Sequence, residues 1–313
     1  MQVHHQTDNL PAFRNAVVTI GTFDGVHKGH QLIIDQMKKE AASINGETVI
    51  ITFHPHPRKI IGKNSGKLFL LTTMEERIFL LEAAGIDHLV VIPFTEAFAE
   101  QDAAVYVKDF LVKYFHPHTI IIGYDHRFGK NRQGDYHLMD ALAPINNYII
   151  KEINERVLNE VTISSTRIRE ALGQGDIKTA NEFLGYPYFF EGRVIHGDKR
   201  GRTIGYPTAN IQLKNPDKLT PADGVYAVRV TLTDSGGQSI VNQGMMNIGL
   251  RPTVDGLNHN IEVHLFDFNE DIYGQIIQIS VIHRIRDEQK FSGIEALKAQ
   301  LEKDRKVALE MLM

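Results

Sequence analysis

Short apolar runs alternate with amphipathic segments through the first half of the chain. The apolar runs are rich in β-branched residues and predict strands at 17–20, 48–53, 88–93, 119–123 and 148–152. The segments between them space their apolar positions as helices do, and they predict helices at 31–42, 74–84 and 104–114. Strands that alternate with amphipathic helices form a mainly parallel sheet covered on both faces. Ligands on such sheets sit beyond the carboxyl ends of the strands.

The rhythm changes after Gly185-Tyr186-Pro187, where strand-like runs follow one another with little helix between them. We predict strands at 189–196, 225–232, 239–247, 261–268 and 276–284, separated by turn sequences such as Asn-Pro-Asp and Ser-Gly-Gly. Many strands with short connections indicate a compact antiparallel barrel or sandwich. A last amphipathic helix is predicted at 294–312. The predicted domains are therefore an α/β domain at 1–185 and an antiparallel β domain at 186–313.

Composition narrows the class of protein. The 313 residues are 42% hydrophobic and 23% charged, as in globular proteins, and they are enough for two cores. The net charge of -4 argues against a general role on nucleic acid or on a membrane surface, although a local basic pocket could still bind phosphate. The chain has no cysteine, no signal-like start and no apolar run of about 20 residues, which predicts a cytoplasmic location.

The segment Gly21-Thr22-Phe23-Asp24-Gly25-Val26-His27-Lys28-Gly29-His30 leaves the first strand and leads into a helix. The free N–H groups at a helix N-terminus and the helix dipole favour an anion there. The glycines let the backbone approach a ligand, and His27 and His30 lie three residues apart on one helical face. Both rings could donate N–H groups to phosphate oxygens, especially as charge develops there. The alternative is two surface histidines in a turn.

A second helix start of this kind lies near the end of the same domain, at Ile163-Ser164-Ser165-Thr166-Arg167-Ile168-Arg169. Its hydroxyl and N–H groups could cap the helix, and an arginine offers a fork of donors to phosphate. Taken alone, the stretch is equally typical of an ordinary helix cap with an exposed arginine. Two such helix starts in one α/β domain favour a nucleotide site.

Two further loops follow predicted strands of the first domain. One contains the run His54-Pro55-His56-Pro57, and the other is Gly123-Tyr124-Asp125-His126-Arg127-Phe128-Gly129. A His-Pro-His-Pro run could also bind a metal ion, but its prolines stiffen the loop and no carboxylate is near in sequence.

The second domain carries a basic, glycine-rich stretch, 197–210, which lacks the pattern G-x-x-x-x-G-K-[ST] of a Walker loop. This stretch could fold over the phosphates of a nucleotide. Thr208 and Asn210 offer oxygens two residues apart, on one face of an extended segment, and such oxygens suit Mg²⁺ or phosphate. A β-hairpin arm with a tight turn is the alternative.

The strand predicted at 261–268 has a polar face. Strand alternation puts its aliphatic residues on one side and Glu262, His264 and Phe266 on the other. Glu262 therefore points toward solvent or a pocket. A carboxylate within hydrogen-bond reach of a hydroxyl can act as its general base, whereas alternation alone favours an ordinary outward glutamate.

The segments 21–30 and 163–169 resemble the signature of nucleotidyltransferases that move a nucleotide's α-phosphoryl group onto a phosphate acceptor. The loops at 52–57 and 123–129 are similar to the flavin-nucleotide loops of bacterial FAD synthetases, although His126 stands where many relatives have phenylalanine. The resemblance implies a Rossmann-like domain that adenylylates FMN with ATP. The implied catalytic residues are His27, His30 and Arg169. The implied ATP contacts are Gly21, Phe23, Asp24, Gly29, Ser164 and Thr166, and the implied FMN contacts are His54, Pro55, His56, Pro57, Asp125, Arg127 and Phe128.

In the second domain, the run Gly-x-Pro-Thr-Ala-Asn at 205–210 and the segments 247–253, 261–268 and 286–291 resemble riboflavin kinases. Arg284 stands where relatives more often carry an aromatic residue. The resemblance implies a β-barrel kinase domain with a terminal helix, in which Glu262 is the catalytic base. The implied contacts to ATP and Mg²⁺ are Gly201, Arg202, Gly205, Pro207, Thr208 and Asn210, with Thr208 and Asn210 as metal ligands, and those to riboflavin are Asn247, Arg251 and Arg286.

The chain as a whole resembles the bifunctional bacterial riboflavin kinase/FMN adenylyltransferases. The implied substrates and products are riboflavin, ATP, FMN and FAD, and Mg²⁺ is the implied cofactor. No nucleic-acid or membrane partner is implied, and self-association is left open. Three alternatives stand beside this interpretation: a single live activity with the other domain as a flavin-binding module, a non-enzymatic flavin sensor, and a nucleotidyltransferase for another acceptor, such as a lipid or pantetheine phosphate precursor.

Overall fold

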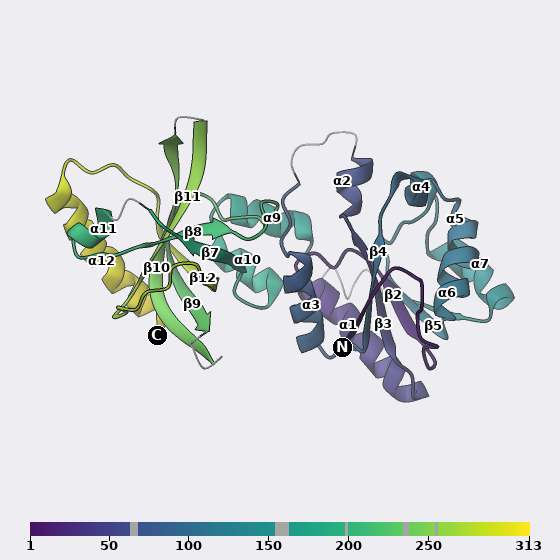
Figure 1. Ribbon diagram of the computed structural model, residues 1–313. Coiled ribbons are helices and arrows are strands. Elements are labelled where there is room, and N and C mark those ends of the chain that lie inside the picture. The colour runs from purple at the N-terminus through teal and green to yellow at the C-terminus, as the bar shows by residue number, and fades with distance from the viewer. Residues whose placement is uncertain (63–67, 154–162, 198–199, 234–237, 254–255) are drawn as a thin grey trace. The chain divides into compact units, whose positions relative to one another are not determined.

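The chain folds into two compact units, Met1–Ser165 and Thr166–Met313, and each is described by itself (Figure 1). The structure is a computed structural model that describes residues 1–62, 68–153, 163–197, 200–233, 238–253 and 256–313. The structure does not describe the side chains of residues 200 and 250–259.

The first unit is built on a six-stranded sheet in the order β1-β4-β3-β2-β5-β6, in which every pair of neighbours is parallel. This confirms the predicted parallel sheet. Its elements are β1 (Gln2–His5), β2 (Val17–Ile20), α1 (Lys28–Ile44), β3 (Thr48–His54), α2 (Pro57–Ile61), α3 (Met74–Ala83), β4 (His88–Pro93), α4 (Glu96–Ala99), α5 (Ala103–Val105), the π-helical η1 (Tyr106–Val112), α6 (Lys113–Phe115), β5 (Thr119–Gly123), the 3₁₀ turn η2 (Lys130–Arg132), α7 (Tyr136–Asn146) and β6 (Ile149–Ile153).

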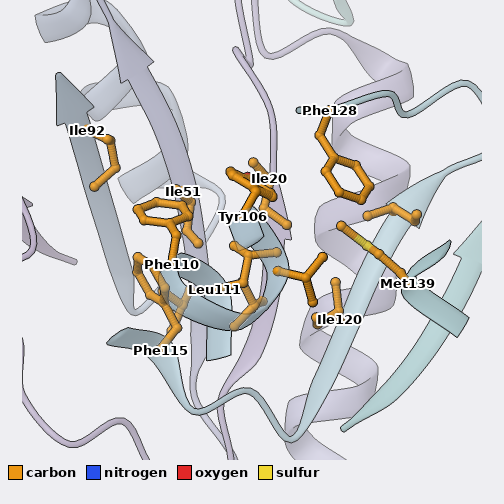
Figure 2. Close-up of a cluster of buried hydrophobic side chains, with 14 of the residues drawn as sticks. Ile20, Ile51, Ile92, Tyr106, Phe110, Leu111, Phe115, Ile120, Phe128 and Met139 are labelled. Carbon is orange, nitrogen blue, oxygen red and sulfur yellow. The ribbon is translucent and has the colours of Figure 1, made fainter. Parts of the chain in front are cut away.

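Both faces of this sheet are buried, as the near-continuous apolar strands predict. Successive strand residues face opposite sides, so that Val17 and Ile50 pack with α1 and α3, whereas Val18 and Ile51 pack with η1 and α7. Figure 2 shows the second of these clusters, in which aromatic residues of η1 pack on isoleucines of the central strands. The two cores hold the strand ends, and the loops that follow them, in fixed positions.

Two features of the first unit differ from the sequence prediction. The helix predicted at 104–114 is three consecutive segments, α5, η1 and α6, because the chain widens to π-helical hydrogen bonding between Tyr106 and Val112. The edge strand β1 was not predicted, because it is only four residues long and its sequence Gln-Val-His-His has one apolar position.

The second unit contains a closed barrel in the order β10-β11-β8-β7-β12-β9, with antiparallel neighbours throughout. This confirms the predicted antiparallel domain and shows that it is a barrel and not a sandwich. Its elements are α9 (Ser165–Gly173), α10 (Ile177–Leu184), β7 (Phe189–Ile195), α11 (Arg200–Thr203), β8 (Ala209–Leu213), β9 (Gly224–Thr233), β10 (Ser239–Thr253), β11 (Gly256–Leu265), β12 (Ile276–Arg286) and α12 (Ile294–Leu312). The short strand β8 was not predicted, and β11 ends before Phe266.

The helices α9 and α10 group with the barrel, although they precede the change of rhythm near residue 185. Asn181 of α10 donates its side-chain N–H to the carbonyl of Val281 in β12, at 3.0 Å. The same side chain accepts the N–H of Tyr188 at 2.7 Å. A hydrophobic pattern reports that a segment is helical, but not which sheet its apolar face covers, and the pattern alone therefore could not place these helices.

The C-terminal helix α12 packs on the outside of the barrel through Ala308 and Leu312, which meet Ala227, Met245 and Phe266. A buried ion pair fixes it. Arg286 at the end of β12 donates from Nε and Nη2 to the carboxylate of Asp304, at 2.8 to 3.0 Å, and Asp304 is only 1% exposed. Gln300 donates to the same carboxylate at 2.8 Å.

Removal of the Asp304 carboxylate should destabilise the second unit, because it leaves the half-buried Arg286 guanidinium without its counter-ion. We expect Asp304→Ala to lower the free energy of unfolding of this unit by about 3 kcal/mol. The matched exposed change on the same helix, Glu310→Ala, should cost less than about 0.5 kcal/mol. Urea denaturation compares the two variants, and equal losses would contradict the anchoring role of the ion pair.

Candidate functional site

The predicted site residues of the first unit follow strands β2, β3 and β5. Because these strands are parallel, their carboxyl ends lie along one edge of the sheet. The chain runs from β2 to β3 on one side and later returns to place β5 on the other side of β2. The space between β2 and β5 is thus the switch point at which open α/β sheets bind ligands.

The turn between β2 and α1 has an unusual backbone. Phe23 and Val26 adopt positive φ angles of 48° and 35°, and Gly25 lies between them at 86°. Only glycine adopts such angles without strain, and a β-branched residue is a clear outlier there. Strained backbone of this kind persists where the surrounding structure holds it, as at many functional sites.

Asp24 provides that hold. Its carboxylate is fully buried and accepts the backbone N–H groups of Leu71 at 3.1 Å and Thr72 at 2.9 Å. Arg77, itself 3% exposed, lies 3.6 Å from the same carboxylate. We predicted that Asp24 contacts ATP, but its buried side chain instead ties the turn to the segment before α3. Sequence reasoning missed Thr72 and Arg77, because they lie far from the motif in the chain.

The two histidines of the turn lie face to face. Their ring centroids are 3.7 Å apart with an interplanar angle of 16°, and Phe23 packs against His30 at 4.7 Å. Gly29 leaves room for this pair, because a Cβ at this position would lie 3.2 Å from the His27 ring, and the ring would have to shift by a few tenths of an ångström. His27 is the N-cap residue of α1, so the pair stands at the helix N-terminus, as predicted.

Burial lowers the pKa of His30 well below its ordinary value, and the nearby positive charges of His27 and Arg77 lower it further. The Nδ1 atom of His30 is buried and has no hydrogen-bond partner among the residues that the structure describes. His30 is therefore neutral near pH 7 in this structure. A bound anion would favour its protonated form.

The serine-rich stretch also reaches the turn. Ser165 at the start of α9 donates its hydroxyl to the backbone carbonyl of Asp24 at 3.0 Å. Ser165 was not among the predicted site residues, whereas its neighbour Ser164 was, and Ser164 is exposed. Thr166 and Arg169 belong to the second unit, and their part in this site stays a prediction.

The run His54–Pro57 bridges the end of β3 and the start of α2. His54 and Pro55 are exposed, and Pro57 is half-buried. His56 is buried, and its Nδ1 accepts the backbone N–H of Arg58 at 3.1 Å, which caps α2. His56 therefore shapes the loop, while His54 and Pro55 are accessible to a ligand.

The loop after β5 divides its residues in a similar way. Asp125 and Arg127 are exposed, and Arg127 pairs with Asp135 at 2.7 Å. Phe128, a predicted FMN contact, is 7% exposed and packs with Tyr106 in the core cluster at a centroid distance of 5.2 Å (Figure 2). Phe128 is therefore a core residue that anchors the loop. Its burial cannot be seen from the sequence, because an aromatic residue in a loop can equally well face a ligand.

In the second unit, three predicted residues form a row across adjacent strands. Asn247 of β10 is paired with Glu262 of β11, and Glu262 is paired with Asn210 of β8. Directly opposite residues on neighbouring strands point to the same face of a sheet. The row lies on the face that α12 covers elsewhere, since Met245 follows the same alternation and packs on that helix.

Glu262 is half-buried and is oriented by two donors. The Thr208 hydroxyl donates to its Oε2 at 3.1 Å, and Asn260 donates to its Oε1 at 2.6 Å. Asn210 is 8% exposed and lies under Gly197, where a Cβ would come within 2.1 Å of its amide nitrogen. The structure thus brings both predicted metal ligands to the predicted base, Asn210 from the neighbouring strand β8 and Thr208 from the segment just before it.

A cavity of about 510 Å³ opens on the opposite face of β11, where Val263 and Leu265, which alternate with Glu262, line it. Arg202, Pro207 and Thr208 line one part of it, and the segment Phe268–Tyr273 lines another. The arm before Thr208 is folded back on itself, since Tyr206 donates its N–H to the Gly201 carbonyl at 2.9 Å. Gly201 is necessary because a Cβ would lie 2.2 Å from the Tyr206 oxygen, and Gly205 is exposed at a φ of 86°.

The riboflavin contacts predicted in the second unit divide into three cases. Asn247 lies in the row beside Glu262. The Arg286 guanidinium is instead bound to Asp304, and it holds α12 on the barrel. The Arg251 side chain lies outside the described residues.

The fold defines a class of protein: a parallel α/β unit followed by a closed β-barrel unit, each with its own cluster of polar motif residues. The family matches agree with this division. Residues 10–167 match the FAD synthetase family, and residues 184–312 match the riboflavin kinase family. The chain belongs to the family of bifunctional riboflavin kinase/FMN adenylyltransferases.

Relatives with that name match nearly the full length. The protein of Haemophilus influenzae is 41% identical, with 94% of each chain covered. That of Escherichia coli K12 is 36% identical over 98% of this chain and 95% of its own, and that of Bacillus subtilis is 38% identical over 94% and 92%. A solved structure described as a macrolide-efflux protein from Streptococcus pneumoniae is 32% identical, with a TM-score of 0.85 and 98% of each chain covered. Within the described residues of the present chain, no helix is both long enough and apolar enough to cross a membrane.

His126 should make the first unit sensitive to acid. Burial lowers its pKa to about 4, and its Nε2 has no hydrogen-bond partner among the described residues. Below pH 6.5, His126 binds a proton in the unfolded chain but stays neutral in the folded unit. The free energy of unfolding therefore falls as the pH drops toward 4. We expect the free energy of unfolding of His126→Phe to exceed that of the unsubstituted chain by up to about 2 kcal/mol at pH 5, and by less at pH 8. Calorimetry at both pH values measures this, with the exposed His137→Phe as control; a pH-independent difference would contradict it.

Proposed function

We propose that the chain makes flavin cofactors in two ATP-dependent steps. In the second unit, the 5′-hydroxyl of riboflavin attacks the γ-phosphorus of ATP, which gives FMN and ADP. In the first unit, the FMN phosphate attacks the α-phosphorus of a second ATP, which gives FAD and pyrophosphate. The proposal is carried by one observation: each unit gathers its own motif residues into a polar site, His27 with His30 in one and Asn210 with Glu262 in the other.

In the kinase step, Glu262 takes the proton of the riboflavin hydroxyl as that oxygen bonds to phosphorus. A hydroxyl holds its proton tightly at neutral pH, and a positioned base is worth about a hundred- to ten-thousand-fold in rate. Thr208 and Asn260 each donate to one carboxylate oxygen and so orient Glu262. Asn247 lies in the same row, opposite Glu262, which supports its proposed contact with the flavin.

The donor set beside Glu262 fits Mg²⁺ bound to ATP. Thr208 offers a hydroxyl and Asn210 an amide oxygen, and Mg²⁺ prefers oxygen ligands while it keeps several waters and substrate phosphates. Thr208 and Asn210 would hold the ion, and Gly201, Arg202, Gly205 and Pro207 would form the arm over the nucleotide. When bound, Mg²⁺ neutralises charge on the phosphates.

The adenylyl step calls for charge and position rather than a base. The second pKa of a phosphate monoester is about 6, so FMN is largely ionised at pH 7 and repels the triphosphate. The N–H groups at the start of α1 and the rings of His27 and His30 offset that repulsion. Because His30 is held neutral by burial, a proton taken up with the triphosphate would add positive charge where it is needed.

The other residues of the first site have supporting roles. Gly21, Phe23 and Gly29 shape the turn, and Ser164, Thr166 and Arg169 extend the phosphate contacts from the second helix start. His54, Pro55, Pro57, Asp125 and Arg127 would hold the flavin nucleotide, with His56 and Phe128 fixing the two loops. The absence of cysteine supports a cytoplasmic location for both reactions.

Loss of the His30 ring should affect one reaction only. We expect His30→Ala to lower the rate of FAD formation from FMN by about a hundred- to a thousand-fold, since it removes a donor to the developing charge. Riboflavin phosphorylation by the same chain should stay near normal. Pyrophosphate release measures the first reaction, with the exposed His137→Ala as control. Loss of both activities in a folded chain would refute separate sites.

The complementary substitution is Glu262→Ala. It should slow riboflavin phosphorylation by about a hundred-fold or more and leave FMN adenylylation unchanged. Chromatographic separation of riboflavin, FMN and FAD measures both, and Glu295→Ala on α12 is the surface control. Full kinase activity in this variant would exclude Glu262 as the base.

A further inference from the structure

The arm Gly201–Thr208 is tied to the barrel at its end by two adjacent contacts. His264 is 9% exposed, and its Nδ1 lies 2.7 Å from the carbonyl oxygen of Pro207. The next residue, Thr208, donates its hydroxyl to Glu262 at 3.1 Å. Since Glu262 and His264 are two residues apart on β11, they point to the same face of the strand. Two successive arm residues therefore meet two successive positions of one strand face.

The contact to Pro207 has a defined chemistry. A carbonyl oxygen only accepts, so the proton of His264 must be on Nδ1 for the hydrogen bond to form. Proline has no N–H, and the carbonyl is thus the one backbone group through which Pro207 can be held. The ring of His264 is packed between Tyr206, at a centroid distance of 5.2 Å, and Phe266, at 5.7 Å, which fixes its orientation.

The arm has a second attachment that does not involve Pro207. Tyr206 donates its hydroxyl to Glu302 of α12 at 2.8 Å, and this contact is exposed to solvent. It can hold the arm near the helix, but it does not contact the peptide between Pro207 and Thr208. The bond from His264 fixes that peptide, and with it the direction of the Thr208 side chain.

We propose that His264 is a positioning residue of the kinase site, which holds the Pro207 carbonyl so that Thr208 faces both Glu262 and the bound nucleotide. The inference rests on the proposed kinase function, because Thr208 matters only if it binds ATP there. His264 itself does not touch the reacting atoms. Its effect should therefore appear in the binding of ATP and not in that of riboflavin.

Three substitutions separate this role from a general effect on folding. In asparagine, the amide nitrogen occupies nearly the place of Nδ1 and can donate to Pro207, whereas glutamine places its amide near Nε2 and leucine has no donor. We expect His264→Gln and His264→Leu to raise the KM for ATP in riboflavin phosphorylation about tenfold, with the KM for riboflavin changed less than about twofold. His264→Asn should stay within about threefold for both substrates. His283→Gln in β12 is the matched control. The rate of FMN adenylylation by each variant shows whether the chain is intact.

An unchanged KM for ATP in the glutamine and leucine variants, or no rescue by asparagine, would overturn the proposal. If the variants do not fold, NMR of the unsubstituted chain decides: the proton of His264 on Nδ1 supports the proposal, and a proton on Nε2 alone overturns it. The Glu262→Ala variant separates this inference from the proposed function. Full kinase activity in that variant would contradict both the proposed kinase site and this inference. A Glu262→Ala variant without kinase activity, together with an unchanged KM for ATP in His264→Gln, would overturn the inference alone.

Discussion

The buried carboxylate of Asp24 is the interaction on which the first site depends. The turn after β2 contains two non-glycine residues in the left-handed region, and such a turn needs an external hold. Asp24 supplies it by accepting two backbone N–H groups and pairing with Arg77. With the turn fixed, Phe23 can pack on His30, and His30 can stack on His27 at the start of α1. The two histidines of the motif are thus held in place by a side chain that is itself fully buried.

The second unit uses a carboxylate in the opposite way. Glu262 is half-buried, and its donors are side chains from the arm and from its own strand. A carboxylate in that setting can accept a proton, whereas the one in Asp24 is saturated by backbone groups and is closed off from solvent. The environment, and not the residue type, therefore decides which carboxylate is able to act as a base. The same distinction applies to Arg286, whose guanidinium is bound by the buried Asp304.

Much of the fold could be predicted because period and length carry the information. The strand at 88–93 and the helix at 294–312 have the predicted bounds, since apolar runs and helical spacing have clear ends there. The edge strand β1 and the short strand β8 could not be predicted, because four or five mixed residues leave no period to measure. The helices α9 and α10 precede the change of rhythm near residue 185 but group with the barrel, and amphipathicity alone does not report what a helix packs against.

For the sites, the motifs point to particular segments, but they do not show which side chains of those segments are buried. Asp24 and Phe128 lie within predicted ligand loops, yet both are buried and hold those loops in place. Arg77 and Asn260 belong to none of the motifs. The folded chain brings Arg77 to Asp24 and orients Asn260 toward Glu262. Residue identity and spacing report what chemistry a segment can offer, whereas burial and hydrogen bonding decide which residue offers it.

Isotope tracing tests most directly whether one chain performs both phosphate transfers. Riboflavin and Mg·ATP are incubated with the chain, once with ATP labelled at the γ-phosphorus and once with ATP labelled at the α-phosphorus. The γ label should enter FMN first and then FAD, while the α label should enter FAD alone. FAD without the α label, or FMN without the γ label, would contradict the assignment of one transfer to each unit.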